Sequence, residues 1–101
     1  MSATETAADW LALATELMPQ ERFVNDPLAA CILALALLDD ARDSRTAARK
    51  LETGHALILR SLVTLEQEPA LIAIDRRDQR TMRSFYHVTE QALALHNLIH
   101  R

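Results

Sequence analysis

Residues 26–38, DPLAACILALALL, combine a helix start signal with the longest apolar run of the chain. Asp26 is a typical N-cap residue, and Pro27 suits the first helical position because it has no N–H to leave unpaired. As a helix, the eleven apolar residues from Leu28 to Leu38 would span about 16 Å. A hydrocarbon core is about 30 Å thick, so we expect a buried helix and no membrane association.

A helix that is apolar on all sides must be covered on all sides. In a chain of 101 residues, we expect either the centre of a bundle or a second copy of the protein to supply this cover. Small residues on one side would let a neighbour approach closely. We therefore predict a homodimer with contacts at Ala30, Ala34 and Leu37.

Outward from this segment, composition favours helices throughout. Half of the residues are apolar, mostly Ala and Leu, and Gly54 is the only glycine, too few for a typical set of hairpin turns. We expect residues 1–101 to form a single all-α domain, an antiparallel bundle of four helices. The alternative is three helices, if residues 27–53 form one.

Local signals suggest where these helices end. Pro19 closes a first helix over residues 5–18. The apolar phase shifts after Leu38, which predicts a break within residues 39–45, with Asp43 or Ser44 as the new cap. Apolar residues at alternating intervals of three and four positions predict a third helix that ends at residue 66. A similar repeat (Phe85, Val88, Ala92, Leu95, Ile99) predicts a final helix over residues 78–100.

The net charge of −3 argues against a wholly basic surface. Two arginine clusters at helical spacing nevertheless predict interaction edges: Arg42, Arg45 and Arg49, and then Arg76, Arg80 and Arg83. Aspartates are interleaved with both clusters, so solvated ion pairs are the simpler interpretation. Binding of nucleic acid through these edges is the alternative.

The histidines indicate no metal or cofactor. Glu52 with His55, and His96 with His100, have helical spacing but do not complete a ligand set. The segment Gly54-His55-Ala56-Leu57 resembles the His-x-Leu start of histidine phosphotransfer domains, although Ile58 and Leu59 stand where that family has Lys and a small residue. The resemblance implies a four-helix bundle with His55 accepting a phosphoryl group.

No catalytic motif or glycine-rich phosphate loop is present, so we expect no enzyme. Cys31, the single cysteine, cannot form an internal disulfide, which favours a reducing cytoplasmic location. The sequence thus predicts a small cytoplasmic protein-interaction module with adaptor or regulatory role, a homodimer that also binds an unknown protein partner. The alternatives are a nucleic-acid-associated regulator and a phosphotransfer-like protein.

Overall fold

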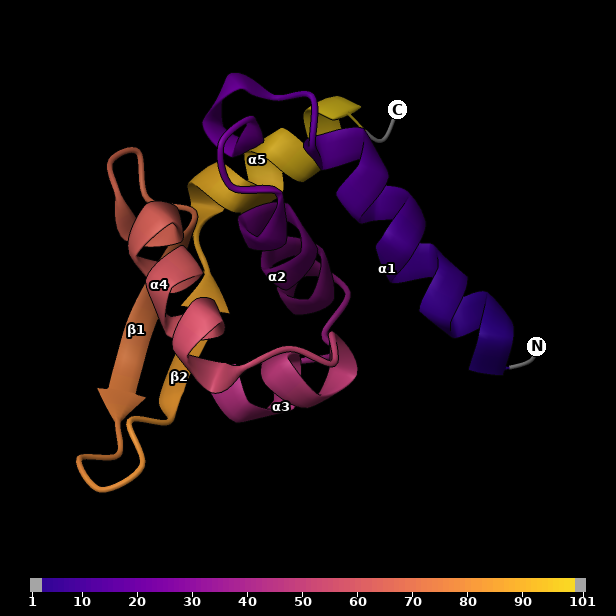
Figure 1. The fold of residues 1–101 in the computed structure, drawn as a ribbon. Helices are drawn as coiled ribbons and strands as arrows, with labels where there is room; N and C mark the ends of the chain where they lie inside the picture. The colour runs from indigo at the N-terminus through magenta and orange to yellow at the C-terminus, as the bar shows by residue number, and fades with distance from the viewer. Residues whose placement is uncertain (1–2, 100–101) are drawn as a thin grey trace.

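The computed structural model describes residues 3–99, which form helices and one β-hairpin (Figure 1). The α-helices are α1 (Ala3–Leu17), α2 (Pro27–Leu37), α3 (Ser44–Lys50), α4 (His55–Glu66) and α5 (Glu90–Ile99), with a short 3-10 helix, η1 (Glu21–Phe23). The strands β1 (Ile72–Arg77) and β2 (Ser84–Val88) stand between α4 and α5. The fold is therefore mixed α/β, and the predictions of an all-α bundle of four helices, or of three, are wrong.

Helix α2 occupies the centre, as its apolar sequence requires. Asp26 caps it by accepting a hydrogen bond from the N–H of Ala29 at 3.2 Å, which confirms the predicted start. In Figure 1, α1 lies to one side of α2, α4 and the hairpin to the other, α3 below and α5 above. Residues 29, 30 and 32–36 are all buried against these neighbours. A single chain thus covers these residues of α2, for which the sequence had suggested either the centre of a bundle or a second copy of the protein.

The predicted break after α2 is confirmed. The chain leaves α2 through Asp39, whose φ is 60°, and α3 begins at Ser44 with Asp43 as its N-cap. The Asp43 carboxylate accepts hydrogen bonds from the N–H of Thr46 at 3.0 Å and from its hydroxyl at 2.7 Å. This cap explains why residues 27–53 are two helices and not one.

A second interruption divides the helix predicted up to residue 66. Residues 51–54 form a turn in which Glu52 has a φ of 51°, and Gly54 is the N-cap of α4. The N–H of Thr53 bonds to the carbonyl of Ala48 and closes the end of α3. Two packed helices are thus joined by a four-residue turn that includes a glycine, which is the connectivity of a helix-turn-helix, and we use this name for residues 44–66.

The final helix predicted over residues 78–100 is wrong in its first half, where the hairpin turn and β2 lie. Strand β2 pairs antiparallel with β1, placing Ile72 opposite Val88 and Ile74 opposite Tyr86, with an irregularity between Ile74 and Arg76. β-Branched and aromatic residues dominate these paired positions, which suits a pleated, half-buried surface. The helical spacing of Phe85 and Val88 with later residues is therefore coincidental.

The hairpin turn closes without glycine. The Asp78 carboxylate accepts hydrogen bonds from the N–H groups of Arg80 at 2.8 Å and Thr81 at 3.4 Å. Met82 takes a φ of 61°, a region that glycine usually fills. The scarcity of glycine argued against hairpin turns in the sequence, but Asp78 and Met82 supply this turn without one.

No helix in the described part of the chain is both long and apolar enough to cross a membrane.

Candidate nucleic-acid interface

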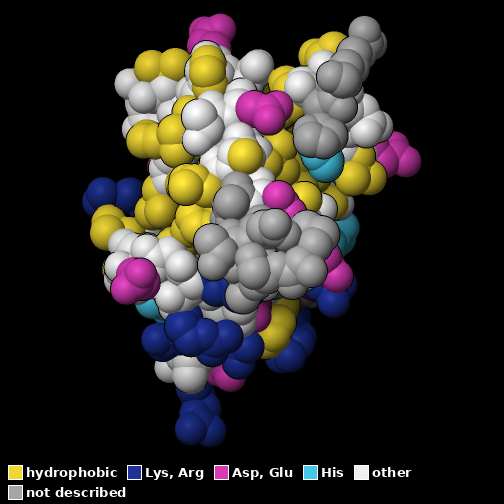
Figure 2. Space-filling model, turned by 90° about the vertical axis from the view of Figure 1, so that its right-hand side faces the viewer, with side chains coloured by type: hydrophobic (Ala, Val, Ile, Leu, Met, Phe, Trp, Pro, Cys, Tyr) yellow, Lys and Arg dark blue, Asp and Glu magenta, His cyan; other side chains and the backbone are white. Residues whose placement is uncertain are grey.

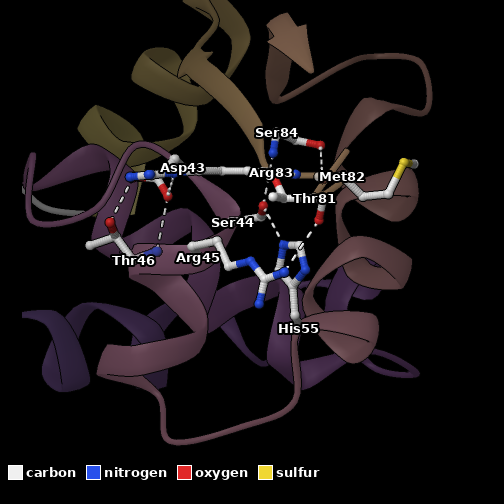
Figure 3. Close-up of polar contacts among 9 residues, drawn as sticks. All are labelled: Asp43, Ser44, Arg45, Thr46, His55, Thr81, Met82, Arg83 and Ser84. Carbon is white, nitrogen blue, oxygen red and sulfur yellow. Dashed lines mark hydrogen bonds and ion pairs between the residues drawn. The ribbon is translucent and has the colours of Figure 1, made fainter. Parts of the chain in front are cut away.

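Three elements of the fold meet at the side chain of Ser44, the first residue of α3 (Figure 3). Its hydroxyl accepts a hydrogen bond from the backbone N–H of Ser84, at the start of β2, at 2.9 Å. The same oxygen lies 2.6 Å from Nε2 of His55, the first residue of α4. Because Ser44 and Ser84 are fully buried, this contact fixes both helices of the helix-turn-helix relative to the hairpin.

An ion pair joins α3 to the hairpin beside this contact. Nε of Arg83 donates to the carboxylate of Asp43 at 2.9 Å. Burial alone would raise the pKa of the Asp43 carboxyl, but hydrogen bonds from Arg83 and Thr46 outweigh burial and lower this pKa to about 2. Asp43 therefore stays ionised at neutral pH while it caps α3 and holds Arg83.

Further contacts bring the two predicted arginine clusters to one end of the molecule. Arg45 of α3 donates to the carbonyl of Thr81 in the hairpin turn at 3.3 Å. On the hairpin, the guanidinium carbons of Arg76 and Arg83 lie 4.1 and 4.9 Å from the centroid of the Phe85 ring. Such stacking restrains both side chains on the hairpin surface.

Charge is distributed unevenly along the chain. Residues 42–88, from α3 to the end of β2, contain nine Lys and Arg against six Asp and Glu, a net charge of +3. Residues 1–41 contain one Arg against seven Asp and Glu, a net charge of −6. Figure 2 shows Lys and Arg side chains gathered at the lower end of the molecule, where Figure 1 places α3 and the hairpin turn. We use the term basic face for the Lys and Arg side chains of α3 and the hairpin: Arg45, Arg49, Lys50, Arg76, Arg77, Arg80 and Arg83.

The predicted aspartate partners neutralise only part of the two clusters. Arg42 pairs with Asp39 at 2.8 Å, and Arg83 pairs with Asp43. Among the residues that the structure describes, the other four predicted arginines form no ion pair with a carboxylate: Arg45, Arg49, Arg76 and Arg80. These four are exposed, so their charges face solvent and are available to a ligand.

Helix α4, the second helix of the helix-turn-helix, has one buried side and one exposed side. Its buried side chains are Ile58, Ser61, Leu62 and Leu65. Its exposed positions before the last residue of the helix are Ala56, Leu57, Arg60 and Val63. Arg60 therefore adds one cation, whereas its neighbours on this surface are apolar.

The residues predicted as dimer contacts lie elsewhere. Ala30 and Ala34 are fully buried within one chain, and Leu37 retains partial exposure. Large apolar side chains that are exposed on α1 and α5 are Leu11, Leu93 and Leu98.

His55, the predicted phosphoryl acceptor, is partly buried with Nε2 engaged by Ser44. Desolvation and the charge of Arg45 lower its pKa, against the opposing effect of Asp43. Within residues 3–99, no group of three or more His, Cys, Asp or Glu is placed to hold a metal ion. His100, the second member of the other histidine pair, lies outside the described residues.

Sequence reasoning identified the arginines of this face but missed Ser44 and Ser84 as its organising residues. The sequence indicated Ser44 only as a possible helix cap, and nothing in it marks the contacts of Ser44 with His55 and Ser84, which are 11 and 40 residues away.

Comparison of the chain with protein-family models, curated proteins and solved structures finds no match.

Proposed function

We propose that this protein binds double-stranded DNA through the helix-turn-helix of α3 and α4 and the adjacent hairpin. The observation that carries the proposal is the position of the basic face, which spans the first helix of a helix-turn-helix and the hairpin fixed to it by Ser44 and Asp43. In DNA-binding proteins with this motif, the second helix enters the major groove while the first crosses the backbone. Exposed cations on α3 are therefore suitably placed to contact phosphates.

The uneven charge supports the same function. A chain with a net charge of −3 would be repelled by DNA if its charges were evenly spread. Here the acidic part, residues 1–41, is separate in sequence from residues 42–88, which contain the helix-turn-helix and the hairpin and carry a net charge of +3. This distribution favours approach of the duplex to the cations of the basic face, although Asp39 and Asp40 lie beside the hairpin in the pocket that Phe85 and His87 line. The proposal keeps the cytoplasmic location and the non-enzymatic role that the sequence predicts.

Fluorescence anisotropy with a labelled 24-base-pair duplex of mixed sequence tests the proposal. We expect binding at 50 mM KCl that weakens steeply as the salt concentration rises. The double variant Arg49→Gln/Arg80→Gln should weaken binding by roughly tenfold or more and reduce the salt slope by about 0.9 for each lost phosphate contact. Neither arginine is in an ion pair within the described chain, so the fold should survive, which circular dichroism can verify.

The control is Glu16→Gln, which also removes one charge, of the opposite sign, at an exposed position on α1. It lies outside the basic face, so we expect DNA affinity close to that of the wild type. Failure of the wild-type protein to bind duplex at 50 mM KCl would refute the proposal. So would equal affinity of the wild type and the double variant.

A second candidate, the homodimeric protein-interaction module, is favoured by the exposed leucines. Leu11, Leu93 and Leu98 are 52%, 47% and 62% exposed, and α1 and α5 lie away from the hairpin turn in Figure 1. A second copy could attach there and leave the basic face open, as in helix-turn-helix dimers that contact two half-sites. Light scattering coupled to size exclusion tests this: we expect a dimer from the wild type and a monomer from Leu93→Lys/Leu98→Lys. A wild-type monomer at 100 µM would reject it.

A further inference from the structure

The surface of α4 has an unusual property for the second helix of a helix-turn-helix: it offers very few hydrogen-bonding groups. Direct reading of base pairs depends on side-chain donors and acceptors that reach the edges of the bases in the major groove. Of the four exposed positions in α4 before its last residue, Ala56, Leu57 and Val63 have none. Arg60 is the one exposed donor among them.

The other uncharged polar side chains of α4 are already engaged within the fold. Nε2 of His55 contacts Ser44. The hydroxyls of Ser61 and Thr64 both donate to the carboxylate of Asp26, each at 2.9 Å. Glu66, at the end of the helix, is an acid that phosphates would repel. Reassigning these groups to a base edge would break contacts that hold α4 to α2 and α3.

The cations, by contrast, lie mostly outside α4. Arg45, Arg49 and Lys50 are exposed on α3, and Arg76, Arg77 and Arg80 are exposed on the hairpin. Contacts from such side chains to phosphate oxygens add affinity and fix orientation, but they carry no sequence information. When α4 lies in the major groove, these cations lie on the elements beside it, so affinity and base reading come from different parts of this surface, and α4 offers little for base reading.

From this distribution we infer that the protein binds duplex DNA mainly through the sugar-phosphate backbone, with little dependence on base sequence. The inference rests on the proposed function and narrows its ligand. One bidentate contact from Arg60 to a guanine provides about 5- to 150-fold discrimination at a single base pair. Sequence-specific proteins typically bind their sites about 10³- to 10⁷-fold more tightly than other DNA.

Selection of binding sites from a pool of random 20-base-pair duplexes tests the inference with the whole chain. We expect the best selected duplex to bind within about 150-fold of the unselected pool, with any preference confined to one base pair. Arg60→Ala should abolish that preference, whereas Arg80→Gln should weaken binding to the selected duplex and the pool by the same factor. Measuring both duplexes with both variants separates base reading from backbone binding.

The two proposals fail in different ways. A selected duplex that binds more than 1,000-fold tighter than the pool, with a consensus over several base pairs, overturns the inference and leaves DNA binding intact. Absence of binding to any duplex at 50 mM KCl overturns both. A consensus that survives in Arg60→Ala also contradicts the inference, because the structure offers α4 no other exposed donor in the segment from residue 56 to residue 63.

Discussion

The hydroxyl oxygen of Ser44 lies 2.6 Å from Nε2 of His55, so the first residues of the two helices of the helix-turn-helix are in direct contact. This oxygen also accepts the N–H of Ser84, and in the neutral tautomer whose Nε2 carries no proton, the hydroxyl of Ser44 donates to Nε2. A protonated imidazole has no acceptor at Nε2 and would leave the buried hydroxyl proton without a partner. The link between α3 and α4 therefore favours neutral His55.

The first prediction concerns the pH dependence of stability. Desolvation and Arg45 lower the pKa of His55 in the folded protein, although Asp43 opposes them. The unfolded state then binds more protons than the folded state, so the contribution of His55 is fully present above the ordinary imidazole pKa of about 6.5 and declines as the pH falls below it. Urea unfolding at pH 7.5 and pH 5 should show this decline in the wild type and a smaller one in His55→Gln, whose amide oxygen can still accept from Ser44. Equal declines in the two proteins would contradict the prediction.

The second prediction concerns acid stability through Asp43. Its pKa in the folded protein is about 2, below the ordinary value of 3.8, because hydrogen bonds from Arg83 and Thr46 outweigh the effect of burial. A depressed carboxyl pKa stabilises the fold above the unfolded value, and this contribution is lost as the pH falls from about 4 to about 2. Asp43→Asn should lower the free energy of unfolding at pH 7 by about 1–2 kcal/mol and flatten its pH dependence over that interval.

Asp39→Asn is the matched control for Asp43→Asn. Asp39 also pairs with an arginine, Arg42, but both side chains are more than two-thirds exposed. Pairs of this kind contribute about 0–1 kcal/mol. Thermal unfolding at pH 7 should therefore separate the two variants clearly, and a loss in Asp39→Asn as large as that in Asp43→Asn would show that burial of Asp43 has no consequence.

The helix boundaries that the sequence predicted correctly depend on local chemistry. Asp26 and Pro27 start α2, and Asp43 starts α3 after the predicted break. Each of these signals acts within about four residues of itself, through a side chain that accepts a nearby N–H or a ring that fixes φ. Local chemistry of this kind is readable without any knowledge of the tertiary fold.

The hairpin escaped prediction because its stabilising contacts are distant in sequence or unusual in composition. Ile72 pairs with Val88 across 16 positions, and the sequence gives no sign of that pairing. The scarcity of glycine was misleading, since three other residues within the described range 3–99 adopt positive φ: Asp39, Glu52 and Met82. The arginine clusters of the site were visible in the sequence. The contact of Arg45 with Thr81, which brings the two clusters together, depends on the hairpin and could not be predicted from the sequence.

The third prediction concerns Asp26, which joins α2 to α4. Its carboxylate caps α2 and accepts the hydroxyls of Ser61 and Thr64. Asp26→Ala removes the cap and leaves the buried Ser61 hydroxyl without this acceptor, so we expect a loss of about 2–4 kcal/mol in urea unfolding. Asp26→Asn keeps a capping oxygen and should lose clearly less. An equal loss of unfolding free energy in the two variants would mean that the charge of Asp26, and not these hydrogen bonds, stabilises the fold.

The last prediction concerns Gly54, the N-cap of α4, which lacks a side chain to bond the free N–H groups of that helix. Its φ of −68° and ψ of 142° suit any residue, and an added Cβ would have no heavy atom within 4 Å. Gly54→Ser should therefore raise the free energy of unfolding by about 0.5–1 kcal/mol, through a capping bond and through lower entropy of the unfolded chain. Gly54→Ala, which lacks the capping oxygen, should gain less, and urea midpoints measure both. Serine adds no charge to the helix-turn-helix, so the affinity of Gly54→Ser for duplex DNA should stay at the wild-type level. Destabilisation by both variants would contradict the prediction and would mean that this turn requires glycine.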